Sequence, residues 1–429
     1  MGHLLSRALN SPAVALARRR RRMLLCAATL VTLAATLTAR AAEWELDVDT
    51  RLVTVDGSPP IIAGGLGSVR FGGDESGLRL GRARFALSQN LGELFSLHLD
   101  ASSWGDRDKT PVGLTEAYLQ LRPYPYAGYR LRVKAGAFYA PLSLENRTSG
   151  WESPYTLSYS AIDSWLGQEV RTIGTEVQLD WLGRHSGHDF DLGATAGVFG
   201  WNDGAGAALA NGGFTLTDRQ TVLWGRVGKP GVPPVRAAEP FREMDGKAGV
   251  YGGLEARYLD RVVLRFLRYD NKADPSAADA VTHTIAWNTT FNSAGLRVEG
   301  GNGWTAIFQW LQGQTSIAPR GGAVQWPFRA SYVLLAKRFG SHTLSARYDK
   351  FEVEGHSDDG GSADDGWQKG HAITLAYIFQ PGARWRYTLE WLRVQSTSYN
   401  REEFADGPPT ASQTQVQLAI RCALGPLAQ

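Results

Sequence analysis

Apolar and polar residues alternate at every second position along much of this chain, and this constrains its fold more than any other feature. Residues 44–53 read WELDVDTRLV, in which most apolar residues share one parity and the charged residues the other. Residues 384–391 (RWRYTLEW) and 415–424 (QVQLAIRCAL) repeat the pattern. Successive side chains of a strand point to opposite faces, so each segment predicts a strand with one apolar, aromatic-rich face and one charged face.

A transmembrane β-barrel satisfies this pattern better than a soluble sandwich does. A sandwich buries its apolar faces against each other and rarely places Trp or Tyr at both ends of so many strands. A membrane barrel turns an apolar band toward lipid, with aromatic girdles at both interfaces and a polar lumen. Backbone groups in lipid must all be paired, so the sheet must close. We therefore predict an all-β fold, an antiparallel transmembrane barrel.

Short turns and long loops alternate along the chain and set the number of strands. Short turns are expected near 90–92, 123–128, 183–187, 259–260, 300–303, 340–341 and 380–382. Longer polar loops are expected at 56–76, 104–111, 140–169, 202–246, 271–285, 316–326, 354–369 and 398–412. This arrangement predicts 16 strands with both ends on the short-turn side.

Two segments fit the strand pattern less well. Residues 215–227 could form a further strand, but this would make the count odd, so we assign them to the extracellular loop 202–246. In LRLGRARFAL (78–87), two leucines share a parity with Arg82 and Arg84. A β-bulge near Gly81 would restore the alternation.

Residues 1–41 predict a secretory signal, with a basic block at Arg18–Arg22, an apolar run and an Ala-Arg-Ala cleavage site. The barrel domain is then 42–429. Seven of the 45 basic residues and none of the 42 acidic ones lie in 1–41, so 38 basic and 42 acidic residues remain. This balance gives no reason to expect a nucleic-acid partner. Cys422 is the one cysteine left, which excludes an intramolecular disulfide.

A row of positive charge is the strongest candidate for the pore wall. Arg130, Arg132 and Lys134 alternate with apolar residues in one predicted strand, and Arg82 and Arg84 lie in another. Their parity places them on the lumen side, where they would favour anions. Many acids share that side, however, so the lumen-facing set is mixed in sign.

The third long loop, 140–169, is too long for a connection without a role. We expect it to fold into the lumen and narrow a channel that would otherwise be wide. Acids on the loop opposite bases on the wall would set up a transverse field. The candidate constriction residues are Glu145, Arg147, Glu152 and Asp163.

Several of these stretches resemble the phosphate-selective porin O/P family of outer-membrane channels. TEAYLQLRP (115–123), followed by RVKAGAFYAPLSLE (132–145), is similar to a family strand that ends in G-x-F-x-x-P-x-x-x-E. GRARFAL (81–87) is similar to the family's basic second strand, and QEVRTIGTEV (168–177) and RYDNKAD (268–274) extend the resemblance. It implies a passive anion channel, with phosphate as one candidate solute.

These observations predict an outer-membrane porin for passive diffusion of small hydrophilic solutes or ions, with no catalysis, cofactor or metal site. Expected partners are the solutes or anions, outer-membrane lipid and lipopolysaccharide, the barrel-assembly machinery, and two further copies in a homotrimer. One alternative is a barrel enzyme such as a lipid hydrolase, which needs a lipid-facing nucleophile near a base. Another is a non-conducting structural or adhesion barrel with a plugged lumen. Strand glycines, such as Gly193, Gly197, Gly249 and Gly253, leave room and favour a channel.

Two histidine-containing segments suggest other chemistry less strongly. His185 and His188 have a spacing that metal ligands use, but they lie in a predicted wet turn, where histidine is common. His98 lies near Ser96 and Ser102 only because all three share one strand.

Overall fold

The computed structural model describes residues 42–60, 64–105, 112–228, 238–279, 284–318, 322–357, 367–405 and 408–426. The predicted signal segment, residues 1–41, lies outside the described residues. Within them, no helix is long and apolar enough to cross a membrane.

Strands make up most of the described chain and all join one antiparallel sheet. The first nine are β1 (Glu43–Val55), β2 (Gly77–Leu91), β3 (Phe95–Ser103), β4 (Val112–Leu121), β5 (Tyr129–Phe138), β6 (Thr172–Trp181), β7 (Phe190–Gly200), β8 (Gly249–Tyr258) and β9 (Val262–Asp270). The others are β10 (Asn288–Glu299), β11 (Trp304–Ile317), β12 (Val324–Phe339), β13 (His342–Val353), β14 (His356–Ser357), β15 (Gln368–Phe379), β16 (Trp385–Ser398) and β17 (Thr410–Leu424).

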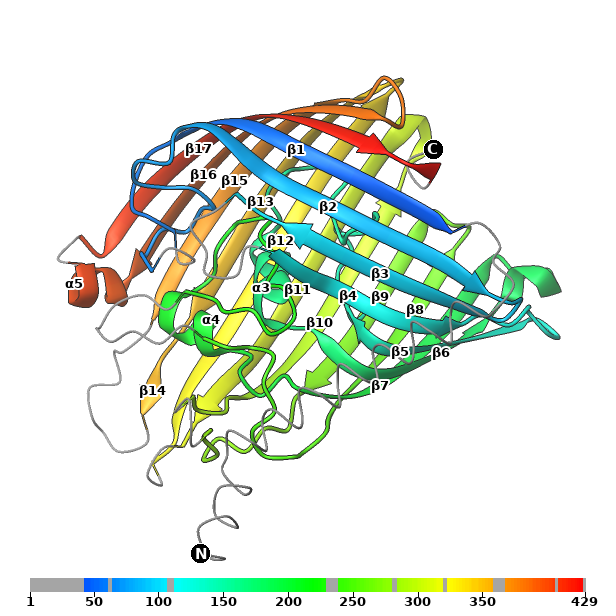
Figure 1. The fold of residues 1–429 in the computed structure, drawn as a ribbon, viewed down its shortest axis with the longest axis horizontal. Coiled ribbons are helices and arrows are strands. Elements are labelled where there is room, and N and C mark those ends of the chain that lie inside the picture. Colours follow the sequence, from blue (N-terminus) through cyan, green and yellow to red (C-terminus); the bar gives the residue numbers. More distant parts are fainter. Residues whose placement is uncertain are drawn as a thin grey trace, which may run out of the picture.

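The sheet closes into a barrel, because β1 pairs with β2 on one side and with β17 on the other. β14 has only two residues and pairs with β12 beyond the end of β13, so 16 strands form the ring. Short turns gather at one end of the barrel and long loops at the other (Figure 1). The predicted 16-stranded antiparallel barrel is confirmed.

The structure also shows how the two segments that fit the strand pattern less well, 78–87 and 215–227, are folded. In the β1–β2 pairing, Asp49 lies opposite Arg82 and Thr50 opposite Leu80, so Gly81 is left out of the ladder. This is the bulge predicted there. The described part of 215–227 contains no strand, in agreement with its assignment to the loop between β7 and β8.

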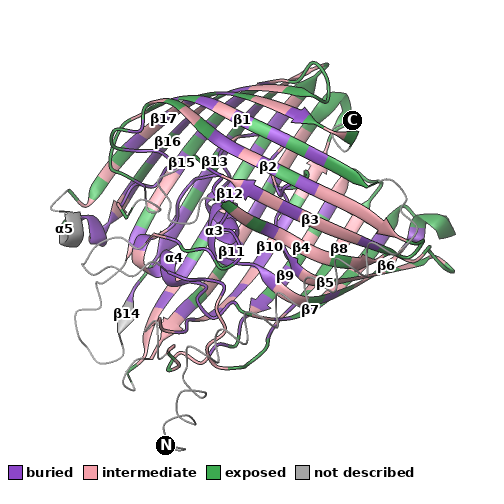
Figure 2. Cartoon of the chain, viewed as in Figure 1, coloured by how far each residue is buried: buried purple, intermediate pink, exposed green. Residues whose placement is uncertain are grey.

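The outer face of the barrel is apolar. Burial alternates along the strands (Figure 2), and exposed Leu, Val, Ile and aromatic side chains occupy the parity opposite to the buried polar ones. Aromatic residues collect toward the short-turn end on this face: Tyr129, Phe190, Tyr258, Trp304, Phe339 and Trp385. A closed sheet with such a face is suited to lipid contact, because it leaves no unpaired edge and presents apolar atoms outward. The chain is an outer-membrane β-barrel.

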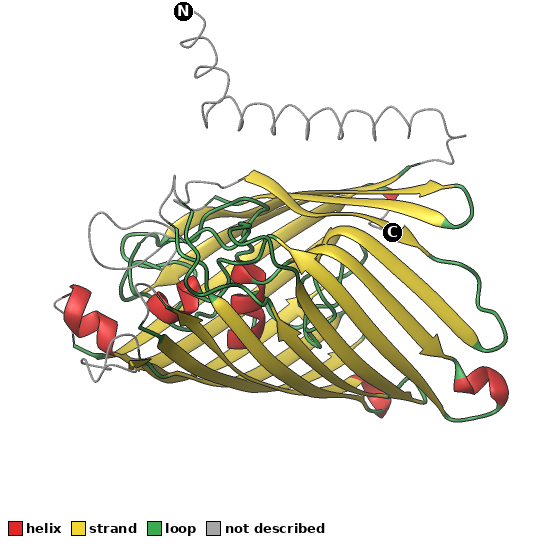
Figure 3. Cartoon of the chain, turned by 90° about the horizontal axis from the view of Figure 1, so that it is seen from below, coloured by secondary structure: helices red, strands yellow, loops and turns green. Residues whose placement is uncertain are grey.

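In the described parts of the long loops there are three short α-helices that the sequence pattern did not predict: α3 (Ala161–Glu169), α4 (Ala207–Gly212) and α5 (Tyr399–Ala405). Ser160 begins α3 as its N-cap, since its Oγ accepts from the N–H of Asp163 at 3.2 Å. Every residue of α3 is buried, and the helix lies against β12 and β13. Figure 3 shows these helices in red and the loops in green, together with the yellow strands.

Glycines on the inner face leave less open space than the sequence suggested. A Cβ at Gly197 would lie 2.3 Å from the ring of Tyr251, and one at Gly249 would lie 2.5 Å from the ring of Phe199. The two rings are almost fully buried. At these two positions a neighbouring aromatic ring fills the space beside the glycine, so these glycines do not support a channel.

Candidate functional site

The basic row on β5 faces acids on the neighbouring strand β6. In this pairing Arg130 lies opposite Asp180 and Lys134 opposite Glu176. Arg130 and Arg132 both contact the Asp180 carboxylate, at 2.8 and 3.0 Å. Lys134 Nζ lies 3.8 Å from Glu176 and also 5.3 Å from the ring centres of Tyr118 and Phe138. Each base of the row is therefore paired with an acid of β6, and each basic side chain is about one-third exposed or less.

Arg82 and Arg84 of β2 are more deeply buried and are also paired. Arg84 contacts Glu45 and Asp47 on β1, both at 3.0 Å, and Asp100 on β3 at 2.6 Å. Arg82 lies 3.9 Å from Asp47 and forms an ion pair with Glu152 of the loop between β5 and β6. These contacts attach the loop to the wall of the barrel.

The four loop residues that the sequence singled out have different surroundings. Glu145 binds the buried Arg347 of β13 at 2.6 Å, and Arg147 binds Glu299 at the end of β10 at 3.1 Å. Glu152 contacts Arg82 and also Arg421 of β17. Asp163 accepts from Ser143 Oγ at 2.7 Å and is fully buried.

Burial and neighbouring charge move the pKa values of two of these loop carboxyls in opposite directions. Burial, helped by the negative charge of Glu145, raises the pKa of Asp163 well above its usual range. Burial also opposes ionisation of Glu152, but Arg421 and Arg82 outweigh it and lower its pKa to about 2. Glu152 is therefore a charged member of the site at neutral pH, whereas Asp163 holds a proton more readily than an exposed aspartate does.

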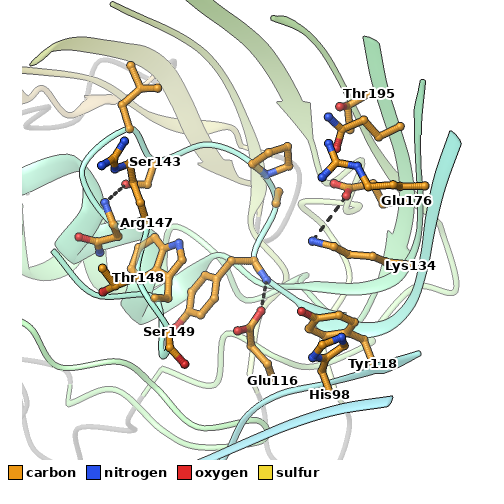
Figure 4. A pocket seen from close by; sticks show the side chains of 18 of the residues that line it. His98, Glu116, Tyr118, Lys134, Ser143, Arg147, Thr148, Ser149, Glu176 and Thr195 are labelled. Carbon is orange, nitrogen blue, oxygen red and sulfur yellow. Dashed lines mark hydrogen bonds and ion pairs between the residues drawn. The ribbon is translucent and has the colours of Figure 1, made fainter. Parts of the chain in front are cut away.

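A cavity of about 680 Å³ lies between this loop and the wall formed by β2 to β10. Figure 4 shows Lys134 and Glu176 on the wall and Ser143, Arg147 and Ser149 on the loop. Seven basic side chains line it against four acidic ones. The bases are Arg84, Arg132, Lys134, Arg147, Arg257, Arg265 and Arg297, and the acids are Asp100, Glu116, Glu176 and Glu255.

The predicted wall residues divide between this cavity and its surroundings. Arg84, Arg132 and Lys134 are among its lining residues, whereas Arg82 and Arg130 are not. The sequence analysis missed Arg257 and Arg297 as lining bases. Their inward-facing parity was visible in the sequence, but the height at which each lies in the barrel follows only from the strand register.

In the part of the chain that the structure describes, the two histidine segments singled out above do not form the sites that the alternatives require. His188 packs against the rings of Trp181 and Phe190. Ser96 Oγ lies 3.0 Å from His98 Nε2, but Ser96 is buried on the inner face and His98 lines the cavity. A lipid hydrolase needs a nucleophile that reaches lipid, and this pair faces the other way.

One group of carboxylates in the described residues could hold a cation. Oxygens of Asp203, Glu243 and Asp245, in the loop between β7 and β8, lie within 4.8 Å of one another. Hard cations take such oxygen ligands, but acidic groups of this kind are also common without an ion. We assign no metal to it.

The same group makes a pH-dependent stability testable. Burial, together with the charges of Glu243 and Asp245, raises the pKa of Asp203 from 3.8 to about 7. Between pH 4 and 7 the folded protein then holds a proton that the unfolded chain has lost, so the free energy of unfolding should fall as pH rises. Urea unfolding across this range should show a shallower fall for Asp203→Asn. Parallel curves for the two proteins would contradict the assignment.

Comparison with known proteins places the fold. No family model and no curated protein matches the chain. A loop L8 deletion mutant of OmpT, an outer membrane protein of Vibrio cholerae, matches with a TM-score of 0.50 at 10% identity, over 90% of this chain and 100% of that one. OmpF of Salmonella typhi, in complex with daunomycin, matches with a TM-score of 0.50 at 8% identity, over 89% and 97%. The chain shares the closed β-barrel fold of these two proteins.

A third match is an anion-selective porin from Comamonas acidovorans, with a TM-score of 0.49 at 14% identity, over 90% of this chain and 99% of that one. At such identities the likeness concerns the fold alone. The resemblance to the phosphate-selective O/P family therefore stays a prediction.

Proposed function

We propose that the chain is an outer-membrane porin through which small hydrophilic solutes diffuse passively, with a preference for anions. The excess of bases in the cavity carries this proposal, since seven basic side chains face four acidic ones there. Asp100, Glu176 and Glu255 pair with bases that are counted among the seven, so the lining keeps an excess of three positive charges. A narrow space of this charge concentrates anions and repels cations.

The loop 140–169 supports the proposal as the element that narrows the path. Its backbone is held by wall carboxylates, because the N–H groups of Leu157 and Ser158 donate to Glu390 of β16 at 2.6 and 3.0 Å. Ala161 N–H donates to Asp349 of β13 at 3.0 Å. The loop begins at β5 and ends at β6, across the ring from β13 and β16, so these contacts are those expected of a segment that crosses the lumen.

A specific observation keeps a non-conducting barrel as the second candidate. Residues of α3 and α4 join one buried apolar cluster with inner-face residues of β7 to β13 and of β15 and β16. Solutes cannot pass through that part of the interior. A solute path must therefore run through the cavity, which is lined by β2 to β10 and by the loop between β5 and β6.

We also propose phosphate as a candidate solute, on the resemblance given above, and a homotrimer as the assembly. Contacts with lipopolysaccharide and the barrel-assembly machinery follow from the barrel class and stay predictions.

Single-channel recording of the refolded mature protein under a KCl gradient tests the function. We expect stable conductance with an anion-selective reversal potential, reduced by phosphate. The double substitution Arg132→Glu plus Lys134→Glu should move the reversal potential toward cation selectivity, because both side chains line the cavity.

Arg393→Glu serves as the matched control, since Arg393 is exposed on the outer-face register of β16. It should leave the selectivity unchanged. A channel without ion selectivity would contradict the anion preference and the proposed phosphate transport. A folded barrel without conductance would favour the non-conducting candidate.

A further inference from the structure

Two cavities lie on either side of one turn in the loop between β5 and β6. Ser149 and Gly150 line the cavity of about 680 Å³, whereas Glu152 and Ser153 line a second cavity of about 30 Å³ beside β1, β16 and β17. The second cavity is large enough for a water molecule. Residues 148–152, which we call the loop tip, therefore separate the two spaces.

The backbone of the loop tip is firmly placed. Trp151 N–H donates to Thr148 O at 3.1 Å, and Thr148 N–H donates to Glu152 O at 3.3 Å, which closes a tight turn. Gly150 has φ +73°, a conformation that favours glycine at this turn position. The Trp151 ring stacks on Tyr139 at 4.1 Å between ring centres. Any opening between the cavities must therefore come from a side chain rather than from movement of the turn.

Glu152 is the side chain that lies at this boundary. Its two carboxylate oxygens contact different arginines, Oε1 with Arg82 of β2 and Oε2 with Arg421 of β17. Arg82 also donates to the carbonyl of Gly150 at 3.3 Å, and Arg386 of β16 donates to the carbonyl of Ser153. One loop carboxylate thus bridges two strands that are separated by β1.

Glu152 adds a loop carboxylate to a cluster of wall arginines. Four arginines surround this point: Arg82, Arg84, Arg386 and Arg421. The wall carboxylates in contact with them are Glu45, Asp47 and Asp100. At this point three contacting wall carboxylates face four arginines, since nearby Asp49 is already paired with Arg51, and the loop supplies a fourth carboxylate. A cluster of guanidinium groups with one missing anion is a ready site for a carboxylate or phosphate group.

We propose that Glu152 is a tethered anion that closes the passage between the two cavities, and that a small oxyanion solute exchanges with it at Arg82 and Arg421. This inference rests on the proposed function and names the gate of that channel. A glutamate side chain can turn away about its own bonds while Trp151 holds the turn in place. An arriving carboxylate or phosphate then satisfies the same two arginines, so neither guanidinium group is left unpaired during exchange.

Because the anion competes with Glu152, the fraction of time that the passage is open should depend on the anion concentration. In the native protein, conductance should rise more steeply than in proportion to the anion concentration, because anions both carry current and displace Glu152. Glu152→Gln keeps the size of the side chain but removes the competing charge. This variant should conduct several-fold more at low salt and lose the steep concentration dependence.

Glu354→Gln is the matched control. Glu354 also pairs with an arginine, Arg329 at 3.9 Å, but it is about half exposed and lines neither cavity. It should behave as the native protein does. Both variants are recorded in planar bilayers in KCl and in potassium phosphate, after the heat-dependent gel shift of a folded barrel has been verified.

The outcomes separate the gate from the channel. If Glu152→Gln conducts as the native protein does, the gate is wrong, but the proposed porin function is not contradicted. A folded native barrel that never conducts overturns the porin, and the gate with it. If Glu152→Gln fails to fold, Glu152→Asp replaces it. This shorter acid cannot span both arginines, so it should show intermediate conductance, and native behaviour would overturn the proposal.

Discussion

Arg347→Met should lower the free energy of unfolding by about 3–5 kcal/mol, because breaking a buried ion pair leaves its partner charges uncompensated. The guanidinium of Arg347 is fully buried and binds two carboxylates, Asp349 at 2.8 Å and Glu145 at 2.6 Å. It also donates to the carbonyl oxygens of Ser158 and Tyr159, each at 2.8 Å. One side chain of β13 thus holds three separate points of the loop between β5 and β6.

The expected loss should be visible in both stability and current. Urea unfolding, followed by tryptophan fluorescence, gives the free energy, and single-channel recordings should show larger and noisier conductance once the loop is released. Arg329→Met on the adjacent strand is the control, because Arg329 pairs with Glu352 but is 60% exposed. Exposed ion pairs contribute only about 0–1 kcal/mol. If Arg347→Met lost only as much stability as an exposed ion pair contributes, about 1 kcal/mol or less, the loop would be held by its apolar contacts instead.

The barrel itself was predictable because its signal is local. Alternation at every second position is visible within one strand, and Gly81 marked the one place where β2 breaks its own parity. The number of strands followed from counting turns. None of these inferences needed to know which residues meet across the sheet.

The partners of the charged residues were not predictable for the opposite reason. Lys134 meets Glu176 and Arg347 meets Glu145 only after the strand register and the loop path are fixed. The sequence indicated a basic row and lumen-facing residues of both charge signs. It did not indicate that the basic row forms ion pairs with acids on the next strand. The helices in the loops were missed as well, since α3 is short and buried on all sides, so it has no amphipathic period.

The glycines of β7 and β8 show how a correct residue property can support a wrong interpretation. Glycine does leave space, but the rings of Tyr251 and Phe199 take that space at two of the four positions. Tyr251 also donates its hydroxyl to Glu176 at 2.7 Å, which places a ring beside the basic row. Composition alone cannot distinguish an open lumen from a lumen in which aromatic rings pack onto glycine.

Trp165→Ala should cost about 3–5 kcal/mol of unfolding free energy, the range typical of truncating a buried tryptophan. Trp165 is 2% exposed on α3 and lies edge-on to Phe291 and Phe328 of the wall, at 5.2 and 5.0 Å between ring centres. Its Nε1–H donates to Glu169 at 2.9 Å, and Glu169 in turn accepts from the N–H of Leu209 on α4. Removing the ring therefore loosens both helices.

This substitution separates the apolar anchor of the loop from the ionic one. Trp224→Ala is the control, because Trp224 is 62% exposed in the loop between β7 and β8 and should cost little. If the ring and Arg347 hold the same loop cooperatively, Trp165→Ala combined with Arg347→Met should cost less than the sum of the two, since either one alone already frees the segment. Strictly additive losses would show two independent anchors. In that case, release of one would leave the cavity, and the anion path that we propose through it, largely as they are.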